Sequence, residues 1–108
     1  MKRIDRRELK EMMDEGRKFT LVEVLPFESF KDYHLPGAIN IPIAAENFDE
    51  RIEAAAPKDG TVVVYCLDSD CDASPKAAKR MEALGFRDVL DYEAGKAEWR
   101  SAGLHTES

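Results

Sequence analysis

Apolar and polar positions divide this chain into short β-rich runs and longer segments with helical spacing. The runs over 19–25, 39–41, 62–65 and 89–90 are rich in β-branched and aromatic residues, which predicts buried strands. Between them, apolar residues recur at helical spacing, which predicts helices between 5 and 16 and over 28–33, 46–56, 75–84 and 96–102. This alternation indicates an α/β fold, with a mainly parallel sheet of about five strands and helices on both faces.

Length and composition set the outer bounds. A chain of 108 residues, 44% hydrophobic and 35% charged, predicts one compact domain over 1–108, with 104–108 as a frayed tail. No apolar run approaches the roughly 18 residues of a membrane span, and the N-terminus lacks the core of a signal peptide, so we expect a cytoplasmic protein. The formal net charge of −6 argues against nucleic acid and anionic membranes as partners.

The segment 61–75 carries the clearest chemical signal. A buried strand delivers Cys66 into a short polar loop, and the loop leads into a helix. Ser74 followed by Pro75 predicts the helix start, with Ser74 as the N-cap. A thiol at the carboxyl end of a strand, beside a helix N-terminus, lies where α/β sheets place their reactive groups.

Four stretches together resemble the rhodanese-like sulfurtransferase family. They are Leu21-Val-Glu-Val24, His34-Leu-Pro-Gly-Ala-Ile-Asn-Ile-Pro42, Val62-Val-Val-Tyr-Cys66 with Ser74 and Ala77-Ala78, and the closing G-F…G-x-x-x-W-x-x-A-G-L pattern from Gly85 to Leu104. The resemblance implies a single-domain rhodanese-like fold in which Cys66 is the catalytic nucleophile and carries sulfur as a persulfide. It also implies that the acidic residue Glu23 is structural, with a hydrogen-bonded carboxylate.

The chain departs from the family pattern at several positions. Leu25 stands where an Arg is common, Ser29 where a Glu is common, and Tyr33 where a Gly usually precedes the histidine. Family loops that handle thiosulfate carry Arg, Lys and Gly after the cysteine. Here the substrate-binding loop reads Leu67, Asp68, Ser69, Asp70, Cys71, Asp72, Ala73.

Sulfur transfer needs a thiolate, and a free thiol with a pKa of about 8.5 is only a few per cent ionised near pH 7. We therefore expect the backbone N–H groups of residues 67–73 to form an anion cradle around Cys66. The N-terminus of the helix that begins near Ser74 would add partial positive charge. Such donors would favour the thiolate and the terminal sulfur of a persulfide.

The loop aspartates oppose anionic donors. We expect Asp68, Asp70 and Asp72 to make thiosulfate a poor donor, so that the partner is a less charged sulfur-containing molecule or a persulfide-carrying protein. Lys76, Lys79 and Arg80 offset part of this repulsion. A phosphatase with a Cys-x5-Arg loop would need Arg at position 72, so Asp72 excludes that class.

Two interpretations of Cys71 stay open. It could resolve a persulfide on Cys66 by forming a disulfide, or it could simply pack at the base of the loop. Two cysteines and His34 fall short of the four ligands of structural zinc, so we expect neither a metal nor another cofactor. We interpret His34 as a residue that holds its turn. The alternative function is a non-catalytic regulatory or partner-binding module, in which Cys66 and Cys71 would serve as a redox sensor.

Overall fold

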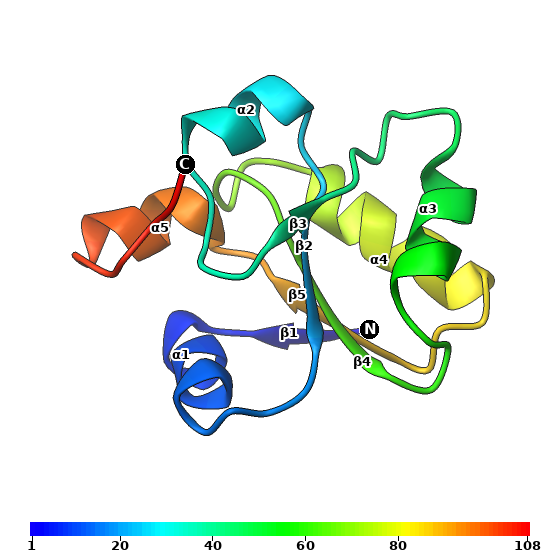
Figure 1. Cartoon of the computed structure of the whole chain (residues 1–108), viewed down its shortest axis with the longest axis horizontal. Helices are drawn as coiled ribbons and strands as arrows, with labels where there is room; N and C mark the ends of the chain where they lie inside the picture. The colour runs from blue at the N-terminus through cyan, green and yellow to red at the C-terminus, as the bar shows by residue number, and fades with distance from the viewer.

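A computed structural model describes all 108 residues (Figure 1). Five strands form one sheet in the order β1-β5-β4-β2-β3, and every pairing is parallel. In chain order the elements are β1 (Lys2–Ile4), α1 (Arg6–Asp14), β2 (Thr20–Glu23), α2 (Phe27–Asp32), β3 (Ile39–Asn40), α3 (Phe48–Ala55), β4 (Thr61–Tyr65), α4 (Ala73–Ala83), β5 (Asp88–Tyr92) and α5 (Gly95–Ser101). The predicted α/β class with a five-stranded parallel sheet is confirmed.

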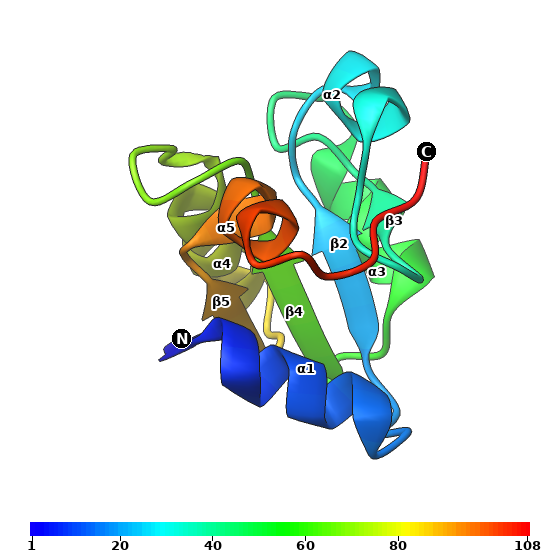
Figure 2. The same cartoon turned by 90° about the vertical axis from the view of Figure 1, so that its left-hand side faces the viewer.

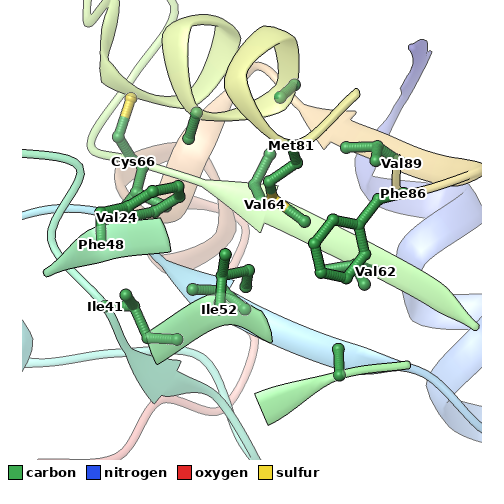
Figure 3. Close-up of a cluster of buried hydrophobic side chains, with 14 residues drawn as sticks. Val24, Ile41, Phe48, Ile52, Val62, Val64, Cys66, Met81, Phe86 and Val89 are labelled. Carbon is green, nitrogen blue, oxygen red and sulfur yellow. The ribbon is translucent and has the colours of Figure 1, made fainter. Parts of the chain in front are cut away.

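Helices cover both faces of the sheet. Figure 2 shows α1 and α5 on one face and α3 and α4 on the other. Successive residues of a strand point to opposite faces, so the central strand β4 contributes to two cores. Val62, Val64 and Cys66 pack with α3 and α4, as Figure 3 shows, whereas Val63 and Tyr65 pack with α1 and α5. The continuous apolar run of β4 therefore reflects burial on both sides.

Two local features differ from the prediction. The strand β1 was not predicted, because only Ile4 of its three residues is buried and the apolar pattern is too short to register. The helix α2 spans Phe27–Asp32 rather than the predicted 28–33, and its first residue, Phe27, is 56% exposed. None of the helices combines the length and the apolar character that a membrane span requires.

The predicted frayed tail is wrong. His34 and Glu107 exchange backbone hydrogen bonds of 2.8 and 2.9 Å, and the Trp99 Nε1 donates to the carbonyl of His105 at 2.8 Å. The tail is thus fastened to the turn after α2, a partnership between distant segments that local composition does not reveal. The Nδ1 of His34 lies 2.8 Å from the carbonyl oxygen of Phe30, as expected of a residue that holds its turn.

A buried ion pair joins three elements on the face covered by α1 and α5. Lys96 and Glu23 are both fully buried, with 3.2 Å between Nζ and Oε2. The same Nζ donates to the carbonyls of Ser29 and Tyr33, each at 2.7 Å. Burial raises the pKa of Glu23, and the Lys96 ammonium opposes that shift. Glu23 therefore has the structural, hydrogen-bonded role expected of it, and its partner Lys96 was not foreseen.

Candidate active site

The N-terminus of α5 holds the start of the Cys66 loop. The carbonyl of Cys66 accepts from the N–H of Lys96 at 3.0 Å, and that of Leu67 accepts from Ala97 at 2.9 Å. Because a trans peptide directs its N–H opposite to its C=O, the N–H groups of Leu67 and Asp68 point away from α5. The first two peptide groups of the loop are therefore oriented by a helix that lies about 30 residues further along the chain.

Gly95 makes this close approach feasible. A Cβ at that position would lie 2.4 Å from the carbonyl oxygen of Leu67, and the φ of Gly95 is +79°. Both the contact and the left-handed backbone exclude an ordinary side chain. The sequence showed Gly95 only as part of a family pattern, and a glycine at the start of a predicted helix was the one local signal.

The Cys66 thiol is fully buried at the end of β4. Its Sγ lies 3.6 Å from the carbonyl oxygen of Cys71, the acceptor for the thiol proton. Burial raises the pKa of Cys66 to about 11, the Cys71 thiol adds to the rise, and the hydroxyl and N–H of Ser74 oppose it. The expectation that the loop favours the thiolate is wrong for this conformation, because desolvation outweighs the donors.

Hydrogen bonds within the loop occupy two of the N–H groups that were expected to form the anion cradle. The N–H of Asp70 donates to Oδ1 of Asp68 at 3.1 Å, and the N–H of Cys71 donates to the Asp68 carbonyl at 3.1 Å. These bonds form a turn closed by the Asp68 side chain and backbone. The N–H groups of Asp70 and Cys71 are therefore not free to bind sulfur, and the cradle has fewer donors than expected over residues 67–73. Ser69, in the same loop, is exposed.

Two of the three cations expected to offset the loop charge, Lys76 and Arg80, are paired with nearby carboxylates. The Nζ of Lys76 lies 3.0 Å from Oδ2 of Asp72, and the Nε of Arg80 donates to Asp49 of α3 at 2.9 Å. Asp70 is exposed and Asp68 is half-buried. The loop thus keeps a negative electrostatic character. No group of three or more His, Cys, Asp and Glu side chains is arranged to hold a metal ion.

Ser74 is not the helix N-cap. The helix begins at Ala73, two residues before the predicted start at Pro75, and follows Asp72, whose side chain makes no capping hydrogen bond. Ser74 lies inside the first turn and is 1% exposed, so its hydroxyl points into the protein rather than capping the helix. It lies close enough to lower the pKa of both Cys66 and Asp91, although it forms no well-aligned hydrogen bond with either.

The sequence also missed Asp91. This residue of β5 is fully buried, and neither carboxyl oxygen has a hydrogen-bond partner. The only signal in the sequence was an acidic residue inside the run Val89-Leu-Asp-Tyr92, where an apolar residue would be ordinary. Strand pairing and the packing of α4 bring it near the thiol site.

The family follows from a match along most of the chain. A model of the rhodanese-like domain matches residues 5–102. The chain belongs to the rhodanese-like domain family. The resemblance drawn from the four sequence stretches is therefore confirmed.

Curated relatives contain this rhodanese-like domain within longer proteins. The chain is 41% identical over 90 residues to the HTH-type transcriptional regulator Rv0324 of Mycobacterium tuberculosis, covering 83% of this chain and 38% of that protein. It is 33% identical over 93 residues to the probable adenylyltransferase/sulfurtransferase MoeZ of the same species, covering 86% of this chain and 23% of that protein. The domain thus spans well under half the length of either relative.

Solved structures share the rhodanese-like fold. The BH2092 protein of Bacillus halodurans has a TM-score of 0.89 at 28% identity, with 99% of this chain and 77% of that chain covered. A thiosulfate sulfurtransferase of Pseudomonas aeruginosa has a TM-score of 0.84 at 27% identity, with 98% of this chain and 20% of that chain covered.

Proposed function

We propose that this domain is a sulfurtransferase in which Cys66 accepts sulfane sulfur as a persulfide and passes it to a thiophilic acceptor. The observation that carries the proposal is the placement of Cys66 at the carboxyl end of the central strand, with the N–H and hydroxyl of Ser74 close to its sulfur. These groups belong to the first turn of α4, where unpaired N–H groups favour negative charge. Relatives named sulfurtransferase or sulfur carrier support the same role.

The transfer consists of two displacements. The Cys66 thiolate attacks the sulfane sulfur of a donor, a new S–S bond forms at Cys66, and the donor leaves as its thiolate or, from thiosulfate, as sulfite. An acceptor thiolate then attacks the terminal sulfur and regenerates the Cys66 thiolate. Because the resting thiol is buried and protonated, we propose that the distal part of the loop, 68–72, moves to admit the donor. The bonds from α5 to Cys66 and Leu67 hold the proximal part in place.

The charge of the loop favours a donor with little negative charge. One charge about 8 Å from another at an effective dielectric of roughly 40 costs about 1 kcal/mol, and a dianion doubles that cost. Asp68 and Asp70 together would then slow thiosulfate by roughly a hundredfold or more before salt screening. We therefore propose a small, weakly charged persulfide or a persulfide-carrying protein as the donor. The pairing of Lys76 with Asp72 and of Arg80 with Asp49 supports this choice.

We extend the proposal to Cys71 as a resolving thiol. Its carbonyl contacts the Cys66 Sγ, and its own thiol is half-buried beside that sulfur. When Cys66 carries a persulfide, the Cys71 thiolate would attack the Cys66 Sγ and expel hydrosulfide, which leaves a Cys66–Cys71 disulfide. An external dithiol would return both cysteines to thiols.

A second candidate is a regulatory or partner-binding module without turnover. The buried thiol with its raised pKa and the acidic loop favour it, as does the similarity to a protein named as a transcriptional regulator. In that case Cys66 and Cys71 would act as a redox sensor rather than as a turnover site.

Mass spectrometry separates the two candidates. Incubation with a low-molecular-weight persulfide should add one sulfur atom, ~32 Da, to the wild type and to Cys71→Ser, and nothing to Cys66→Ala. Wild type should then release sulfide and form an internal disulfide, whereas Cys71→Ser should keep its persulfide. Absence of uptake from a persulfide, polysulfide and thiosulfate alike would support the module and reject the enzyme.

A further inference from the structure

Three buried oxygen atoms without hydrogen-bond partners gather beneath the Cys66 loop. They are Oγ of Ser74 and both carboxyl oxygens of Asp91. Asp91 lies opposite Val64 in the pairing of β5 with β4, and Cys66 follows Val64 by two residues on the same side of the sheet. Ser74 reaches the same place from α4. Three elements therefore bring a thiol, a hydroxyl and a carboxyl group together in one buried space.

The surroundings of Asp91 favour its neutral form. A buried carboxylate with neither oxygen bonded carries a large desolvation cost unless a cation accompanies it. Arg3 on the neighbouring strand is the cation that acts on Asp91, but it is exposed and pairs with Glu93 at 3.1 Å. Glu93 itself adds unfavourable negative charge. Burial accordingly raises the pKa of Asp91, with the Ser74 hydroxyl opposing the shift.

A neutral carboxylic acid differs from a carboxylate in having an O–H to donate. Ser74 has one hydroxyl proton, so it can donate to only one neighbour at a time. If Asp91 were ionised, it would attract that proton and leave a lone pair of Ser74 facing the sulfur. If Asp91 is protonated, it donates to Ser74 Oγ and leaves the Ser74 proton for the sulfur.

We propose that Asp91 is a positioning residue of the Cys66 site: as a neutral acid it donates to the Ser74 hydroxyl, which in turn donates to the anionic sulfur on Cys66. The proposal rests on the proposed function only in taking Cys66 as the reacting thiol. Asp91 and Ser74 both keep their protons, so no proton is lost or gained, and only the orientation of the Ser74 hydroxyl is fixed. The other thiol facing Cys66 is Cys71, and it is removed in the test below.

The test measures the alkylation of Cys66 by iodoacetamide, an uncharged reagent, as a function of pH. All variants carry Cys71→Ser, so that one thiol reports. Asp91→Leu and Ser74→Ala each remove a link of the donor chain and should raise the thiol pKa by about one unit. The thiolate fraction at pH 7.5 then falls about tenfold, and the rate about threefold once the higher nucleophilicity of the more basic thiolate is counted. Asp91→Asn keeps a donor and should recover most of the rate lost with Leu. Asp88→Asn changes an exposed carboxylate at the opposite end of β5 and serves as the control.

A second readout observes the proton directly. The ¹³C resonance of the Asp91 carboxyl group should report a protonated acid at pH 7 and titrate above the usual range of aspartate. An ionised Asp91 at neutral pH, or an Asp91→Asn rate as low as that of Asp91→Leu, would overturn the proposal. If Asp91→Leu does not fold, the resonance and the Ser74→Ala and Asp91→Asn rates decide. Alkylation needs no sulfur donor, so a failure of persulfide uptake would reject the proposed function without changing this result.

Discussion

Because Cys66 is buried, we expect its thiol to react slowly at neutral pH. The perturbation is pH, applied to a Cys71→Ser variant that reacts with the uncharged disulfide 4,4′-dithiodipyridine. With a pKa of about 11 for Cys66 in the wild type against about 8.5 for a free cysteine, the thiolate fraction at neutral pH is at most roughly 300-fold smaller than in an unstructured peptide, because Cys71→Ser removes the part of the rise that the Cys71 thiol adds. A more basic thiolate is intrinsically more nucleophilic. With a Brønsted slope of 0.4–0.5, this higher nucleophilicity offsets about a factor of ten of the loss in thiolate fraction.

Cys66 should therefore react up to about 20-fold to 30-fold more slowly than a free cysteine at neutral pH. Its rate should rise about tenfold per pH unit and should not level off below pH 10. Stopped-flow absorbance of the released thiopyridone, with a short cysteine peptide as reference, measures both quantities. A rate equal to that of the peptide at neutral pH, or a plateau near pH 8, would show that the loop favours the thiolate after all and would refute the burial argument.

The same shift has a consequence for stability. Because burial raises the Cys66 pKa, the folded state prefers the protonated thiol. This contribution is fully present below the unfolded thiol pKa of about 8.5 and is lost as pH rises toward the folded value. The free energy of unfolding of wild type relative to Cys66→Ala, measured with urea, should thus be constant below about pH 8.5. It should fall as the pH rises from there toward about 11.

Three further predictions test the charges and contacts around the loop. Replacing Asp68 and Asp70 with Asn should raise thiosulfate turnover at least tenfold at low salt, with a smaller gain at high salt; a flat rate would contradict the electrostatic argument. Lys96→Met leaves the buried Glu23 without its cation and should lower the free energy of unfolding by about 3–5 kcal/mol, with partial recovery in Lys96→Met with Glu23→Gln. The exposed Lys79→Met is the matched control for urea unfolding, and an equal loss there would count against the ion pair. Gly95→Ala forces a Cβ into the loop carbonyl and should change the Cys66 alkylation rate several-fold together with a loss of about 1–3 kcal/mol of stability. An unchanged rate and stability would show that the loop does not depend on this approach.

Local patterns in the sequence predicted the α/β class and four of the five strands. The β-branched run of β4 and the alternation of strands with helices predicted the parallel sheet. At the start of α1, Asp5 and Glu8 form a capping box, another local feature, with hydrogen bonds of 2.8 and 3.2 Å. The position of Cys66 at a strand end followed from the same patterns. These features depend on neighbours within a few residues, which is the range that periodicity and capping report.

Partnerships between distant segments were not predictable. Glu23 and Lys96 lie 73 residues apart in sequence, and only the packing of α5 against β2 shows that one neutralises the other. The tail was predicted to fray because its own residues carry no signal of the turn at His34 to which it bonds. Ser74 has the residue type of a helix cap, yet the fold turns its hydroxyl toward Cys66 and Asp91.

The sequence by itself determined which thiol lies at the carboxyl end of a central parallel strand, because a strand is encoded by its own side chains. Only the tertiary structure shows that this thiol and the acid beneath it are buried, which raises the pKa of both groups. A pKa depends on how much water and which charges surround a group in three dimensions. Part of those surroundings comes from β5 and α5, which lie far from Cys66 in the chain.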